Sequence, residues 1–550
     1  MPIGYNGLVS WTRRRVLQAL GASALTPALP SVLTPWLTSC GSAKTGSPVI
    51  AMPVRASSEI RSQLREAVES LARELGPVAA LAVIQRRGGA MADGTERRAS
   101  QTMSMSLRIA VLGQGTTIEQ VSDNLGRDGV ARVVEAVRTR ALAARRSAPP
   151  DPAPAFQALG PPRDQVSQLV IDPRSALPGT WNAEALRLYD RASSVGGSRI
   201  VYRSAYLAFD DSETLFLGDG LDRFQRIVRV RTGVVFVAQN AVVQSVGRSG
   251  ARSGDPSASG RVSGPARRVT GDDTAVVPAL EVCENHGTAG LEAMALSAEA
   301  LDGAAARALS IISPLLPQGG DTDVVLEPSV AALIVRQCLA PALDGQQWVS
   351  GACRAAGLRG QPLAPAEVSL LDDPTLSGGF GSYFFDHEGA DARPTPLIEG
   401  GALRGPLLDR RSARALGLPA TGSARQQTMG GAISPLPSNL ILSPGQAQLE
   451  ELIATIDSGL LIEGGSSART DVRTWRFVVR ASRAREIIKG KLSGVLFGAV
   501  DLHGTIPDLL AAIRGLSATR ERQAFDLGAA SSVTSPYILT RTRVIPVPRV

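Results

Sequence analysis

The residues best able to do chemistry are few, because the 550 residues include only three histidines and four cysteines. Cys283-Glu284-Asn285-His286 places a cysteine and a histidine three residues apart, and such a pair can share one metal ion. Further zinc ligands would have to come from Cys338, Cys353, His387 or His503, and no spacing recommends any of them. We therefore expect structural roles for Cys283 and His286, and keep a peptidase site built on them as an alternative.

Carboxylates and serines offer other chemistry. Asp372-Asp373, and Asp386 with Glu388, are close enough in sequence to exchange protons, but such pairs in loops usually cap turns. Serine hydrolysis is not indicated, because Ser382 and Ser412 lack the Gly-x-Ser-x-Gly turn. We expect none of these residues to be catalytic.

Composition excludes several classes of protein. Charged residues make up 20% of the chain with nearly balanced signs, which excludes a disordered acidic or basic tail protein. Four cysteines exclude a disulfide scaffold. The only lysines are Lys44, Lys489 and Lys491, which argues against P-loop and Schiff-base chemistry. The length allows about three domains.

The first residues are typical of an export signal. Arg13 and Arg14 precede a short apolar stretch that prolines interrupt, and Cys40 follows Leu37-Thr38-Ser39. We expect residues 1–39 to be a twin-arginine lipoprotein signal, Cys40 to be lipidated, and the protein to be membrane-anchored in the periplasm. Loss of the three signal arginines lowers the formal charge from +8 to +5, too little to indicate nucleic-acid binding.

The elements that must position these residues fall into four segments. After a tether at 40–56, an α/β unit is predicted at 57–145, with helices at 57–75 and 130–145 and strands at 79–84 and 103–111. The central region, 146–319, is predicted to hold a proline-rich linker at 146–165, strands at 198–209, 214–217 and 227–242, a turn at Asp219-Gly220, a mobile loop at 249–271, and helices within 288–316. Arg229 and Arg231 alternate with valines, which predicts an exposed face of an antiparallel sheet.

The C-terminal segment, 320–550, is predicted to begin with a strand at 323–326 and a helix from Pro328 to about Ala340. A hairpin is expected around Glu399-Gly400-Gly401, and a short helix at 412–418. The apolar side of the first helix makes Cys338 a core residue, and sequence leaves open whether it pairs with Cys353. The fold class is therefore α+β, with an N-terminal α/β unit, antiparallel sheet regions and a mostly β C-terminal domain with short helices.

The most distinctive stretches of the C-terminal segment are Asp386-His387-Glu388-Gly389, the run Arg393 to Gly405, Leu407-Leu408-Asp409, Ser412 to Leu418, and Thr421 to Arg425. With these stretches in this order, the chain from about residue 320 to 545 resembles the C-terminal domain of the TldD/PmbA family, also called the modulator-of-DNA-gyrase family. Weaker similarity extends to the family's first two regions.

The resemblance implies a zinc motif that this chain lacks. TldD-type members carry His-Glu-x-x-x-His on the helix that begins here at Pro328, with two imidazoles holding Zn²⁺ and the glutamate activating its water. Those positions fall on Val335, Arg336 and Ala340. The pattern therefore resembles the PmbA (TldE) type, the partner subunit that lacks the motif.

Three functions follow from this reading. The first is a non-catalytic PmbA/TldE-like subunit, with no cofactor of its own, that pairs with a zinc-bearing TldD-type subunit and helps hold peptide substrate. The second is a homodimeric envelope scaffold that keeps the protease fold without activity. The third is the independent peptidase built on Cys283 and His286.

Overall fold

The computed structural model describes residues 55–94, 97–112, 117–147, 159–176, 178–238, 279–310 and 315–547. Arg13, Arg14, Cys40, the signal at 1–39, nearly all of the tether at 40–56 and the loop at 249–271 lie outside these residues. No helix in the described ranges is both long and apolar enough to cross a membrane.

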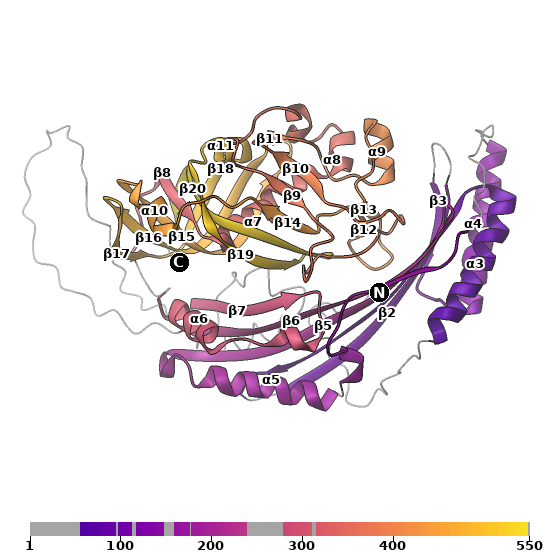
Figure 1. Ribbon diagram of the computed structural model, residues 1–550, viewed down its shortest axis with the longest axis horizontal. Coiled ribbons are helices and arrows are strands. Elements are labelled where there is room, and N and C mark those ends of the chain that lie inside the picture. The colour runs from indigo at the N-terminus through magenta and orange to yellow at the C-terminus, as the bar shows by residue number, and fades with distance from the viewer. Residues whose placement is uncertain are drawn as a thin grey trace, which may run out of the picture.

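The N-terminal part is built on one seven-stranded sheet of the described residues, ordered β3-β2-β1-β5-β6-β4, with β7 also paired to β6 (Figure 1). Its strands are antiparallel except for β4, which runs parallel to β6. The strands are β1 (Val78–Ala92), β2 (Arg97–Leu112), β3 (Thr117–Ser122), β4 (Arg163–Val166), β5 (Ile200–Gly218), β6 (Leu221–Ala238) and β7 (Ala279–Gly287). Segments 57–145 and 146–319 thus contribute strands to the same sheet.

Several predicted elements are present with different bounds. The helices at 57–75 and 130–145 are α3 (Arg55–Leu75) and α4 (Arg127–Ser147). The strands expected at 198–209 and 214–217 are one strand, β5, and the Asp219-Gly220 turn joins it to β6. Both turn residues have positive φ, 54° and 73°, as a tight hairpin turn requires. The polar strands β3 and β4 were not predicted, because neither has an apolar alternation.

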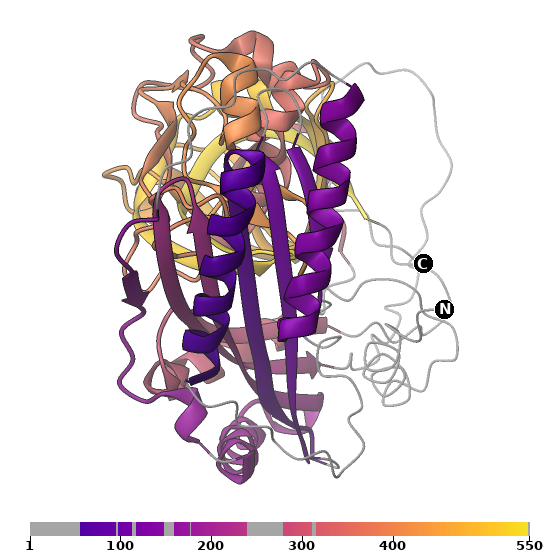
Figure 2. The same cartoon turned by 90° about the vertical axis from the view of Figure 1, so that its right-hand side faces the viewer.

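Helices cover one face of this sheet. α3 and α4 pack over one end, where Leu64, Leu71 and Val137 meet Leu107 and Leu217 (Figure 2). α5 (Pro178–Ser193) and α6 (Ala298–Ser310) cover the other end (Figure 1). α6 lies in the stretch 288–316 that was predicted to be helical. This face carries Val228, Val230 and Val234 of β6, so its burial follows from the hydrophobic alternation.

The opposite face of the sheet is covered by the C-terminal domain, so the predicted exposure of Arg229 and Arg231 is wrong. The two side chains do point away from the valines, as the alternation predicted, but only 9% and 1% of their surfaces are exposed. Arg231 forms an ion pair of 2.6 Å with Glu284 of β7. A strand pattern shows which residues share a face, but not which domain later covers that face.

The C-terminal domain contains a closed β-barrel. β8 pairs with β15 on one edge and with β20 on the other, so β20, β18, β16, β15 and β8 form a ring. The barrel and its flanking strands are β8 (Gly320–Leu326), β9 (Leu370–Asp372), β10 (Thr395–Glu399), β11 (Ala402–Leu403), β14 (Asn439–Leu442), β15 (Ser458–Asp471), β16 (Arg476–Ile488), β17 (Lys491–Phe497), β18 (Val500–Thr505), β19 (Gly515–Asp526) and β20 (Ala530–Pro546). A separate pair is formed by β12 (Ala424–Gln426) and β13 (Ile433–Pro435).

Short helices complete this domain. They are α7 (Pro328–Ile334), α8 (Gly345–Val349), α9 (Arg410–Leu416), α10 (Leu449–Ala454) and α11 (Ile506–Ala511). The hairpin at Glu399–Ala402 and the helix predicted at 412–418 are present as β10–β11 and α9. The observed architecture is the predicted α+β class.

Polar side chains of β6 hold the two parts together. Gln225 Nε2 donates to Phe385 O at 2.9 Å, and its Oε1 accepts hydrogen bonds from the main-chain nitrogens of Phe384 and Phe385. Arg229 donates from Nε to Phe380 O at 2.7 Å and from Nη2 to Ser382 O at 2.9 Å. The sheet thereby provides the hydrogen-bond partners that the buried segment 380–385 needs.

We expect Gln225→Met to lower the free energy of unfolding by about 2–4 kcal/mol, because it leaves three main-chain groups buried without partners. Urea unfolding followed by circular dichroism would measure the change. The control is Gln361→Met on the surface, where the amide donates only to Gly357 O. Equal stability of the two variants would contradict a junction that depends on Gln225.

Candidate functional site

The helix that begins at Pro328 changes its geometry where the family motif would lie. α7 is followed by a π-helical turn, Val335–Leu339, in which the Ala340 main-chain nitrogen donates to Val335 O. Residues five apart do not share a face of an α-helix, but a hydrogen bond between them brings both to the same side. The π turn thus gives positions 335 and 340 the proximity that a His-Glu-x-x-x-His motif requires.

Arg336 lies inside the fold at this turn. It is 8% exposed, and its Nε donates to Ser531 Oγ at 2.8 Å. Burial, reinforced by the positive charge of Arg425, lowers the pKa of Arg336 to about 10, and Asp372 partly opposes this shift. At neutral pH the guanidinium is therefore charged and would repel a metal cation at this position.

Arg425 is the second arginine of this region. Nη1 donates to Ala530 O at 3.1 Å, Nη2 donates to Pro437 O, and the guanidinium lies 5.0 Å from the centre of the Tyr383 ring. Its Nε is buried and has no hydrogen-bond partner among the described residues. Arg425 was noticed in the sequence only as part of the family resemblance.

The Asp372-Asp373 pair has structural contacts. Asp372 accepts hydrogen bonds from the Ser438 main chain and hydroxyl, at 2.7 and 2.9 Å, and burial raises its pKa to about 6. Asp373 accepts from the main chain and hydroxyl of Thr375. Each carboxylate therefore caps a nearby segment, as the sequence suggested for loop carboxylates.

The turn Asp386-His387-Glu388 is held from within. Asp386 accepts hydrogen bonds from the main chain of residues 388, 390 and 424, and burial raises its pKa to about 6. His387 Nδ1 accepts from the Gln426 main chain at 3.0 Å, and burial together with nearby arginines lowers its pKa to about 3. Burial raises the pKa of Glu388 to about 7, although its carboxylate accepts from the Arg410 main chain. His387 is therefore neutral and has a structural role.

The Cys283 and His286 pair does not converge. The two residues are three apart on β7, so their side chains point to opposite faces of the sheet. Cys283 lies in the core beneath α6, whereas the His286 ring packs edge-on against Phe380. One ion cannot bridge them, and no group of three or more His, Cys, Asp or Glu side chains in the described ranges is placed to hold a metal.

The remaining cysteines and serines also have structural contacts. Cys338 and Cys353 are both buried free thiols, and Cys338 lies in the core as predicted. Ser412 forms a capping box with Asp409 at the start of α9, and Ser382 donates to Leu376 O. The serines thus stabilise local structure, which agrees with the absence of a serine hydrolase motif.

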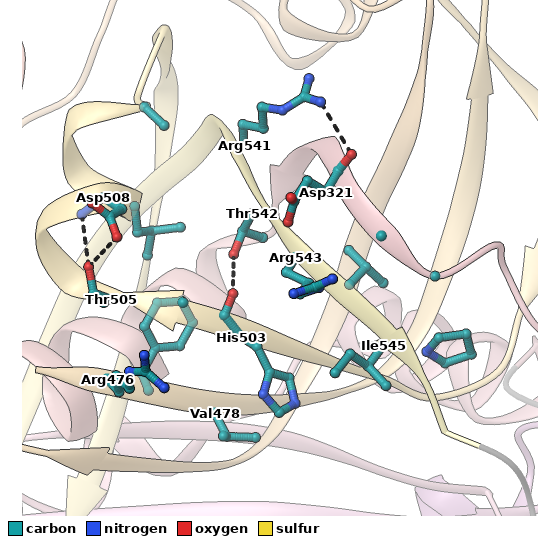
Figure 3. Close-up of a pocket in the computed structure, with 18 residues that line it drawn as sticks. Asp321, Arg476, Val478, His503, Thr505, Asp508, Arg541, Thr542, Arg543 and Ile545 are labelled. Carbon is teal, nitrogen blue, oxygen red and sulfur yellow. Dashed lines mark hydrogen bonds between the residues drawn. The ribbon is translucent and has the colours of Figure 1, made fainter. Parts of the chain in front are cut away.

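A groove of about 1070 Å³ is lined by residues of β8, β16, β18, β20 and α11 (Figure 3). α11 and β18 lie on the side of the C-terminal domain away from the N-terminal sheet (Figure 1). Its polar side chains include Arg476, His503, Asp508, Arg541 and Arg543. Asp508 is bonded to Thr505 as a helix cap, and Arg541 is bonded to the main chain of Asp321. The groove offers charged side chains for binding, and its Thr505 hydroxyl, which donates to Asp508 at 2.6 Å, is the N-cap of α11.

The raised pKa of Glu388 predicts a pH-dependent effect of Glu388→Gln. Stability from this group is fully present below its ordinary pKa of 4.5 and is lost as pH rises toward 7, because ionisation is less favourable in the folded protein. The glutamine keeps an acceptor for the Arg410 main chain but cannot ionise. We expect the variant to gain about 1–3 kcal/mol relative to the parent between pH 5 and pH 8.

Thermal unfolding at both pH values would measure this difference. Glu367→Gln is the control, because that side chain is exposed and should give no pH-dependent gain. If the stability of Glu388→Gln relative to the parent stayed constant from pH 5 to pH 8, Glu388 would already be ionised in the folded protein at pH 5.

Comparisons with known proteins agree with the fold and with the resemblance of the C-terminal domain. Residues 319–545 match the model of the PmbA/TldA metallopeptidase C-terminal domain. A metalloprotease of Methanothermobacter thermautotrophicus is 30% identical over 38% of this chain and 46% of its own length. A TldD homologue of Haemophilus influenzae is 25% identical over 40% of this chain and 45% of its own length. The chain thus aligns with slightly less than half of these relatives.

Solved structures extend the likeness to the whole fold. A candidate modulator of DNA gyrase from Thermotoga maritima superposes with a TM-score of 0.67, covering 88% of this chain and 100% of its own at 16% identity. TldE from Thermococcus kodakarensis gives a TM-score of 0.65, covering 88% and 99% at 17% identity. At such identities the likeness concerns the fold alone. Residues 319–545 are thus similar to the C-terminal domain of the PmbA/TldA metallopeptidases, and the chain shares the fold of these solved structures.

Proposed function

We propose that this protein is a non-catalytic, PmbA/TldE-like subunit that pairs with a zinc-bearing TldD-type subunit in a metallopeptidase complex. One observation carries the proposal: the π turn has the geometry for two ligands five residues apart, but Val335 and Ala340 occupy those positions. Neither side chain has a lone pair to give a metal. Arg336, in the place of the catalytic glutamate, cannot act as a base at neutral pH.

The zinc of such a complex would lie on the partner, and this chain would contribute fold and substrate contacts. The substrate would be an extended or unfolded peptide. With the expected twin-arginine signal and lipidated Cys40, we place the complex at the periplasmic side of a membrane. These parts of the proposal rest on the sequence of the first forty residues and on the family resemblance.

Reconstitution tests the proposal directly. The mature chain would be purified alone and together with a family member from the same genome that carries both a signal and His-Glu-x-x-x-His. We expect a complex that cleaves an unfolded protein and loses that activity when the partner's glutamate is replaced. A stable homodimer that does not bind the partner would favour the envelope scaffold instead.

The geometry at the π turn predicts that metal binding can be restored. We expect V335H/R336E/A340H to bind Co²⁺ or Zn²⁺ more tightly than V335H/R336E, because only the triple variant places two imidazoles on one side of the turn. Titration followed by Co²⁺ absorption would measure this. Equal affinity of the triple and double variants would show that positions 335 and 340 do not converge.

A further inference from the structure

We propose that Arg336 and Arg425 form a binding site for a peptide carboxylate, at the place where a catalytic relative would hold its metal. This proposal rests on the proposed function in one respect, namely that the ligand is a peptide. It adds the chemical group that the vacated site recognises. The site would bind an anion where the catalytic subunit binds a cation.

The first support is the lack of carboxylate partners for these two guanidiniums. Among the described residues neither arginine forms an ion pair, whereas four other buried arginines do: Arg108 with Glu119, Arg223 with Asp391, Arg231 with Glu284 and Arg483 with Glu463. A buried charge without an opposite charge is costly to the fold. In the described part of the chain no carboxylate lies within ion-pair distance of Arg336 or Arg425, and Asp372 acts on both only at longer range.

The second support is unused hydrogen-bonding capacity. A guanidinium has five N–H donors. Arg336 is found to use one, from Nε to Ser531, and Arg425 has a buried Nε without a partner in the described part of the chain. Arg229 differs because its two hydrogen bonds to main-chain oxygens fix it at the junction. The free N–H groups of Arg336 and Arg425 could therefore donate hydrogen bonds to an incoming carboxylate.

The third support is the state of the neighbouring groups. Asp372 is the carboxylate whose charge acts on Arg336, but its Oδ1 accepts hydrogen bonds from the main chain and the hydroxyl of Ser438. Arg425 is also close enough to influence His387, which is neutral, and Tyr383, whose ring lies beneath it. The groups around the two arginines thus leave positive charge to be balanced by a ligand.

A carboxylate suits this site better than a neutral ligand does. The planar fork of an arginine matches the two oxygens of a carboxylate, and such charge-assisted bonds are the stronger kind. Every linear peptide has one such group at its C-terminus, and acidic side chains provide others. Arg336 remains 8% exposed, so part of its side chain can be reached from solvent.

The test compares one peptide with a free C-terminal carboxylate and the same peptide amidated. Binding to the whole mature chain would be measured by fluorescence anisotropy at low salt, with a sequence that contains no acidic side chains. We expect the free acid to bind at least about tenfold more tightly, because an additional charged hydrogen bond is worth that much. Arg336→Leu should remove this preference, and Arg336→Lys should reduce it, since lysine keeps the charge but loses the fork.

Arg543→Leu is the matched control, because this exposed arginine lies in the groove beside α11 (Figure 3). It should leave the preference unchanged. Arg336→Leu should also unfold at the same temperature or higher, since it removes a buried charge without a carboxylate partner. Retention of the preference in a folded Arg336→Leu protein, or equal binding of acid and amide, would overturn the proposal.

Inorganic phosphate and acetate separate a peptide site from a general anion site. Each salt would be added to the complex with the free-acid peptide and to the complex with the amidated peptide. If phosphate or acetate displaced both peptides at the same concentration, the assignment to a peptide carboxylate would be overturned. The outcome is also distinguishable from failure of the proposed function. Binding is measured on this chain alone, so it can succeed when no zinc-bearing partner binds, and it can fail while the reconstituted complex still cleaves protein.

Discussion

The relation between the two halves of the molecule depends on polar side chains of β6 that bind the main chain of residues 380–385. A buried loop needs a partner for each main-chain group, and a flat apolar sheet could not provide them. Gln225 and Arg229 do so across the junction. The same loop carries Tyr383 beneath Arg425, so the N-terminal sheet indirectly positions the charged region around Arg336. The scaffold and the vacated site are therefore one connected structure.

Under the proposed function, the π turn accounts for a helix that keeps the shape of a metal site without metal ligands. Its unusual hydrogen bond is a main-chain feature and does not depend on histidine side chains. The surroundings are apolar, with Val335 and Ala340 packed in the core of the C-terminal domain. Packing alone can therefore preserve the arrangement. Arg336 carries a positive charge at the position where the His-Glu-x-x-x-His motif would have a glutamate.

Much of the fold could be predicted, because amphipathic helices such as α3 and α4 and the strongly alternating strands carry a clear periodic signal. The short polar strands β3 and β4 lack this signal. The closure of the barrel depends on pairing between β8 and β20, and the local sequence of a strand does not show which distant strand it pairs with. At the site, the assignment of Val335, Arg336 and Ala340 to the three motif positions comes from the family resemblance and stays a prediction. The contact from Arg336 to Ser531 could not be predicted, because Ser531 lies among small residues without a motif.

The pairing of β20 has a consequence for the order in which the protein can form. Along its length this strand pairs with β8, β14, β18 and β19, so four other strands depend on it for main-chain hydrogen bonds. Its partner β8 begins about two hundred residues earlier in the chain. Until β20 has been synthesised, the barrel stays open and these strand edges remain free to pair with other chains. A ribosome-bound chain would therefore need protection from aggregation until nearly all of its described residues had emerged, although its N-terminal sheet could fold much earlier.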